Sequence, residues 1–185
     1  MVMTLSRGWR QAALTAHVVS SVGWLGAVLV FLAMALIGLF SPDVLTVRGA
    51  YLLMEQGGWF VLVPLAVASL ATGIIQSLGT PWGLFRHYWV IFKLGITVVA
   101  TAVLLAYLQT FALMAQTAAD PGAELEAVRS VSPVLHAGAA ALVLLAATVL
   151  GVYKPRGMTR YGQRQQQKTR RAGTSTAAPS ERTMT

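Results

Sequence analysis

The sequence predicts an all-α integral membrane protein, a bundle of four transmembrane helices with both termini in the cytoplasm. Of its 185 residues, 56% are hydrophobic and only 11% are charged, and the mean hydropathy is +0.64. Soluble domains carry about 25% charged residues. Four apolar segments, at 12–40, 58–78, 88–114 and 134–153, each reach the length of about 20 residues that a spanning helix needs. Together these segments define a membrane domain over residues 12–153.

The first segment, 12–40, follows a short N-terminus of residues 1–11 that carries Arg7 and Arg10. A signal peptide has a similar basic start, but its apolar region spans only about 7–15 residues. We therefore interpret 12–40 as a retained helix. This segment and 88–114 are longer than the hydrocarbon layer requires, so they must tilt, kink or project beyond the lipid. In the second segment, 58–78, Pro64 predicts a loosened turn near the outer end.

Basic residues set the predicted orientation, because cytoplasmic loops are enriched in lysine and arginine. Four spans place both termini and the 79–87 loop on one side of the membrane. The opposite side holds only Arg48 and Arg129. The first side holds eleven basic residues, namely Arg7, Arg10, Arg86, Lys154, Arg156, Arg160, Arg164, Lys168, Arg170, Arg171 and Arg182. We therefore expect both termini to be cytoplasmic, in a multi-pass protein of the bacterial cytoplasmic membrane.

The basic tail over 154–185 is rich in Arg, Gln, Thr, Ser and Gly, and most of the net charge of +8 comes from it. Such a composition cannot bury enough apolar surface to offset its ordering entropy, so we expect the tail to be disordered. Anionic lipid head groups are its predicted partners. Nucleic acid is not, because no aromatic residue follows Tyr161 to stack on bases. The chain has no cysteine, which excludes disulfides, thiol catalysis and iron–sulfur clusters.

Two polar faces point to a site inside the bundle. His17, Ser20, Ser21 and Trp24 lie on one face of the first helix by their helical spacing, and Lys93 shares a face of the third helix with Trp89, Thr97 and Thr101. At about 1.5 Å per residue, His17 and Lys93 lie at similar depths, about 10 Å from the cytoplasmic surface. Gln76, near the end of the second segment, reaches the same level. We therefore predict that His17, Lys93 and Gln76 meet.

Simpler interpretations stand beside this one. The Lys93 stem is long enough to snorkel and carry its ammonium to the cytoplasmic interface. His17 alone is as well explained by a hydrogen bond to a neighbouring helix. His87 lies among aromatic residues typical of an interfacial anchor, and His136, at a helix start, is interpreted as structural. Intramembrane ionisable residues usually mark function, however, and two at one depth on inward faces favour a site.

Several stretches resemble a known family: "WRQAALTAHVVSSVGWLGA", "YLLMEQGGW", "ATGIIQSLGTPWGLFRHYWVIFKLGIT" and "HAGAAALVLLAATVLGVYKPRG". They are similar to an actinobacterial family of four-helix membrane proteins of unknown function (DUF2269) over about residues 9–160. The first three also resemble, more distantly, the membrane protoporphyrinogen oxidase family and the membrane domain of copper-resistance D proteins. Shared elements map onto His17, Trp24, Gly26, Trp89 and Lys93. The arginine that those families place soon after the first helix is missing before Arg48.

The distant resemblance implies a b-type haem, with His17 as axial ligand and Lys93 near a propionate or quinone oxygen. Ser21, Trp24, Gln76 and Trp89 complete the implied cofactor site. An enzyme is not predicted, but any activity would be that of a membrane oxidoreductase. The alternatives are an accessory or assembly subunit that contacts another membrane protein or its own copies, and a small-molecule or metal carrier. Hydrolase chemistry is excluded, since no paired carboxylates or Ser–His–Asp set occur at compatible depths.

Overall fold

The computed structural model describes residues 6–79, 84–153, 155 and 157–175. Parts of the predicted N-terminus and tail (1–5 and 176–185) lie outside the described residues. Long helices account for most of the described chain. They are α1 (Arg7–Phe40), α2 (Val44–Gly57), α3 (Val63–Leu78), α4 (Tyr88–Ala119), α6 (Ser132–Tyr153) and α7 (Arg160–Ser175), with a short π-helix η1 (Gly58–Leu62) and a short α5 (Leu125–Val128).

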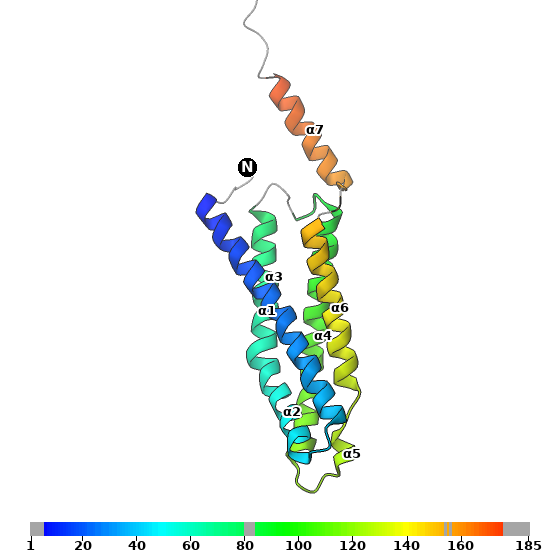
Figure 1. Ribbon diagram of the computed structural model, residues 1–185. Coiled ribbons are helices and arrows are strands. Elements are labelled where there is room, and N and C mark those ends of the chain that lie inside the picture. The colour runs from blue at the N-terminus through cyan, green and yellow to red at the C-terminus, as the bar shows by residue number, and fades with distance from the viewer. Residues whose placement is uncertain (1–5, 80–83, 154, 156, 176–185) are drawn as a thin grey trace, which may run out of the picture.

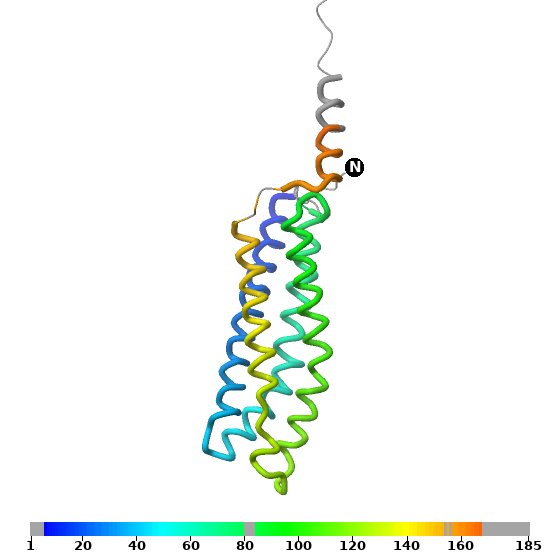
Figure 2. Tube along the Cα trace, turned by 90° about the vertical axis from the view of Figure 1, so that its right-hand side faces the viewer, coloured from blue at the N-terminus to red at the C-terminus, as the bar shows by residue number. Residues whose placement is uncertain are grey.

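The helices form an elongated antiparallel bundle (Figure 1). Turned by 90°, the bundle again shows its long helices side by side (Figure 2). One end of the bundle, where α1 begins and α7 projects, is called the terminal end. The opposite end, where α2 and α5 lie, is called the loop end. Four stretches are long and apolar enough to cross a membrane: Arg7–Phe40, Val44–Leu78, Tyr88–Ala119 and Leu125–Tyr153. The prediction of an all-α fold with four helices long and apolar enough to span a membrane is therefore confirmed.

Side chains are distributed as expected for a bundle whose solvent is lipid. Large apolar residues face outward from the spans, for example Phe60, Phe92 and Leu142, which are 76%, 64% and 69% exposed. Seven inward positions of α1 follow a spacing of three and four residues, namely His17, Ser20, Trp24, Val28, Phe31, Ala35 and Gly38. This spacing is typical of helices packed at shallow angles. Small residues within the seam allow close approach: a β-carbon built on Gly23 would lie 3.3 Å from Leu65 of α3.

The second span begins much earlier than the predicted 58, because α2, η1 and α3 run on without a break. The sequence places 44–57 between the first two apolar segments, and Arg48 lies in that stretch. In η1 the amide of Val63 donates to the carbonyl of Gly58, a bond one residue longer than in an α-helix. Pro64, which has no amide proton, follows directly. The wider turn accommodates the proline without ending the helix, as the predicted loosening requires.

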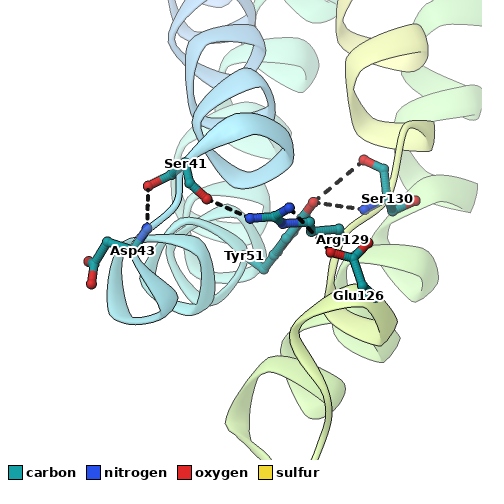
Figure 3. Close-up of polar contacts among 6 residues, drawn as sticks. All are labelled: Ser41, Asp43, Tyr51, Glu126, Arg129 and Ser130. Carbon is teal, nitrogen blue, oxygen red and sulfur yellow. Dashed lines mark hydrogen bonds and ion pairs between the residues drawn. The ribbon is translucent and has the colours of Figure 1, made fainter.

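Arg129 and Tyr51 fasten the loop end (Figure 3). Arg129 donates to the carbonyl of Ser41 at 2.7 Å and pairs with Glu126 at 3.3 Å. The buried hydroxyl of Tyr51 accepts from the amide of Ser130 at 3.0 Å. These contacts tie the α1–α2 turn to the segment that precedes α6. The loop end is therefore held by side-chain bonds to the main chain as well as by packing.

At the terminal end, the start of the tail is fastened to the segment before α4. Thr159 donates its amide to the carbonyl of Arg86 at 3.0 Å and its hydroxyl to the carbonyl of Phe85 at 2.6 Å. His87 and Met158 form an isolated antiparallel bridge. A β-carbon built on Gly162 would lie only 2.5 Å from the Arg86 carbonyl, so only glycine fits there.

The described part of the tail contains a helix, α7, which runs from Arg160 to Ser175. Arginine, lysine and glutamine are good helix formers. A composition too polar to build a core does not prevent a single helix that starts from an anchored end. Figure 1 shows α7 leading away from the bundle.

Candidate functional site

Polar side chains from three spans gather inside the terminal half of the bundle. We call this group the His17–Lys93 cluster: His17 and Ser21 on α1, Ser69 and Thr72 on α3, and Lys93 on α4. The sequence prediction that His17 and Lys93 lie at one depth agrees with this geometry, because Lys93 Nζ lies 3.3 Å from His17 Nε2.

The partners of the His17 ring define its tautomer. Nδ1 lies 3.1 Å from the carbonyl oxygen of Ser69 and 3.2 Å from Thr72 Oγ1. A carbonyl only accepts, and the Thr72 hydroxyl already donates to the carbonyl of Ala68 at 2.6 Å. Nδ1 must therefore carry the proton and donate it. In the neutral ring, Nε2 is then left with its lone pair.

The lone pair of Nε2 faces the rest of the cluster. Lys93 Nζ donates to it, and Ser21 Oγ lies 3.5 Å away. Ser21 Oγ also bonds Ser69 Oγ at 2.9 Å. The imidazole is thus held on one edge by α3, while its other edge meets a primary amine from α4. This arrangement resembles the way that metal-binding histidines are oriented, in which the far ring nitrogen donates to a carbonyl.

Two glycines make room for the pair. A β-carbon on Gly73 of α3 would lie 3.1 Å from His17 Cε1, and one on Gly151 of α6 would lie 3.0 Å from Lys93 Nζ. All four spans therefore contribute to the cluster. Lys93 points across the bundle toward α1 and α6 in this structure, and its ammonium is not drawn out along its own helix.

Lys93 has no carboxylate partner within the described part of the chain. The only ion pair among those residues joins Arg129 and Glu126 at the loop end. Thr97 donates its hydroxyl to the carbonyl of Lys93 at 2.9 Å, and Thr101 donates to the carbonyl of Thr97 at 2.8 Å. A charged Lys93 would lie between helices with an imidazole as its nearest polar neighbour.

The remaining predicted site residues lie around the cluster. Trp24 is buried seven residues further along α1 and lines a separate cavity. Gln76 is half-buried one turn beyond Thr72 on α3, and none of the described hydrogen bonds joins it to His17 or Lys93. Trp89 is half-buried one turn before Lys93.

Sequence reasoning missed Ser69 and Gly151, and it did not assign Thr72 or Gly73 to the site. The Ser69 contribution to His17 is a main-chain carbonyl, and the glycines contribute space, so no residue-type pattern identifies them.

The other histidines lie apart from the cluster. His87 is buried in the segment before α4, where it bridges to Met158. His136 is near the start of α6, with Nδ1 2.9 Å from the carbonyl of Ser132. The described residues contain no group of three or more His, Cys, Asp or Glu side chains that would hold a metal ion. Neither the sequence nor the fold matches a known family, a curated protein or a solved structure.

Proposed function

We propose that this protein binds an anionic, redox-active group at the His17–Lys93 cluster, with haem b as the first candidate. One observation supports the proposal above the others: an amine from α4 meets an imidazole from α1 at 3.3 Å, and no carboxylate within the described residues balances it. Lys93 is half-buried, and an ammonium is costly at membrane depth unless an anion accompanies it. A ligand that supplied the anion would explain why a lysine is kept there.

The residues of the cluster fit a haem in two respects. His17 presents a lone pair on Nε2, and its Nδ1 is already held by the Ser69 carbonyl, as is usual for an axial histidine. Lys93 lies next to Nε2 and would move away from it to pair with a propionate. A bound haem would supply one-electron redox chemistry. The family resemblance of the first three segments supports the same candidate.

The orientation and location belong to the same proposal. The eleven-to-two distribution of basic residues supports cytoplasmic termini, in a bacterial cytoplasmic membrane. The terminal end, where α1 and α7 begin, would then face the cytoplasm, and the cluster would lie on that side. Basic residues of the tail would contact anionic lipid head groups.

The experiment is to purify the protein in detergent from cells supplied with a haem precursor and to record the Soret band. Wild-type protein should carry haem. His17→Ala should lose the band, and Lys93→Met should reduce it, because methionine keeps the length of lysine and removes the charge. His136→Ala is the matched control, a histidine of the spans outside the cluster, and should leave the band unchanged.

The proposal would be overturned by two results together. Wild-type protein would show no Soret band, and neither cluster variant would lose any other bound small molecule. The cluster would then serve helix packing alone, as expected of an accessory or assembly subunit. A labelling experiment tests the orientation separately: cysteines introduced at Gly122 and Thr174 should react oppositely from outside intact cells.

A further inference from the structure

A second site lies about 10 Å further along α1 than His17, at the level of Trp24. A cavity of about 240 Å³ is formed there between α1, α4 and α6. Its lining is almost entirely apolar and includes Trp24, Phe31, Leu104 and Phe111. A cavity of about 150 Å³ in a protein interior binds a benzene molecule. This one therefore has room for a substituted aromatic ring.

One polar corner interrupts the apolar lining. His136 and Tyr107 line the cavity, and their rings stack with centroids 4.0 Å apart and planes 24° apart. Tyr107 shares a 2.7 Å hydrogen bond with the hydroxyl of Ser132. His136 Nδ1 donates to the carbonyl of Ser132 at 2.9 Å. This bond leaves the lone pair on Nε2 of the neutral ring, for which the described residues offer no hydrogen-bond partner.

The cavity borders the surface that faces lipid. Val99, Val103 and Val143 line it and are 62%, 51% and 40% exposed. A molecule dissolved in the bilayer reaches the cavity through this side without crossing water. The occupant must therefore be soluble in lipid. Aromatic walls favour a flat ring, and the unpaired acceptor on His136 favours a ligand with an O–H donor.

We propose that this cavity binds a hydroquinone ring of the lipid-soluble quinol class, with a ring hydroxyl donating to His136 Nε2. The inference is independent of the His17–Lys93 cluster and concerns binding alone. His136 is exposed, and an apolar acyl chain would fill the same volume but would offer its imidazole nitrogen no hydrogen-bond donor. A ring hydroxyl satisfies the nitrogen and the apolar walls together.

The test uses duroquinol titrated calorimetrically into nanodiscs that contain the full chain, with empty nanodiscs as the blank. The dimethyl ether of duroquinol is the matched ligand, because it keeps the ring and loses both O–H donors. Loss of one hydrogen bond corresponds to about tenfold in affinity. We expect saturable binding of duroquinol and binding of the ether that is weaker by about that factor.

Three variants refine the test. His136→Phe keeps a ring to stack on Tyr107 and should weaken duroquinol binding by about tenfold. Val103→Phe, at the lipid rim, should block the cavity for both ligands, and Lys93→Met should change neither. Equal affinity for duroquinol and its ether would assign the cavity to an acyl chain and overturn the proposal. So would the absence of saturable binding to wild-type protein, and both results are independent of whether a variant folds.

Discussion

Arg48 offers the sharpest test of the structure at the loop end. Its guanidinium donates to the carbonyl of Ala118 at 2.9 Å, to that of Ala123 at 2.7 Å, and to that of Asp120. α4 ends at Ala119, so these carbonyls belong to its last turn and the loop that follows. A cation there also complements the negative end of the helix dipole. Arg48→Met removes all three bonds and keeps much of the apolar stem.

The size of the effect follows from the exposure of the acceptors. The bond to Asp120 is exposed, and water replaces it at little cost. The bonds to Ala118 and Ala123 are partly buried. Bonds from charged donors contribute about 1.5–3 kcal/mol each, with the lower end expected at partial exposure. Arg48→Met should therefore destabilise the fold by about 2–4 kcal/mol. Arg48→Lys should lose about half as much, because one ammonium cannot reach both partly buried carbonyls.

Thermal unfolding in detergent at a fixed scan rate measures the difference. For a chain of this length, about 2–4 °C of melting temperature corresponds to 1 kcal/mol, so Arg48→Met should melt about 4–16 °C below wild type. Arg10→Met is the control, since the Arg10 side chain is exposed and makes no described hydrogen bond. If the two variants melted together, the Arg48 contacts would contribute nothing to stability and the reasoning would be refuted.

Two further predictions concern the loop end and the packing. Gly38→Ala should lower the free energy of unfolding by about 1–3 kcal/mol, because its β-carbon would lie 3.0 Å from the buried Tyr51 ring. Gly26→Ala has open space around it and should be neutral or slightly stabilising in the same melting assay. Asp43 caps α2 by accepting from Thr46, and these bonds hold the pKa of Asp43 below its usual range. The cap is therefore present above about pH 4 and is lost as the pH falls through the lowered pKa. Protection of the Thr46 amide, meaning its intrinsic exchange rate divided by the observed rate at the same pH, should fall only in that acid range, and Asp43→Ala should show little protection at every pH.

Most of the bundle could be predicted from the sequence because apolar length is a strong signal. The ends of the spans could not. α2 contains Arg48 and Glu55, and it lies outside the apolar segment 58–78 that defines the second span when the sequence is considered alone. In the structure the arginine is bonded to carbonyls of the α4 end, a partner 70 residues away. The position of Arg48 within α2 thus depends on a contact with the end of α4, which the local sequence pattern does not indicate.

The site was predictable in its ionisable members and not in its surroundings. His17 and Lys93 stand out as costly residues at one depth, and Ser21 follows from its helical spacing to His17. The carbonyl of Ser69 and the space at Gly151 have no chemical signature in the sequence. Trp24 lies on the same face of α1 as His17, yet it belongs to the cavity, because seven residues of helix separate the two levels.

The central claim is that Lys93 and His17 hold an anionic group, and one titration tests it directly. Haem b is added to purified apoprotein in detergent, and its dissociation constant is measured for wild type and Lys93→Met. The same pair of proteins is then titrated with the haem dimethyl ester, which has no propionate charge. We predict that Lys93→Met weakens haem binding by about tenfold, as expected for one charged bond, and leaves binding of the ester unchanged. Equal haem affinity for the two proteins, or no binding by wild type, would contradict the claim.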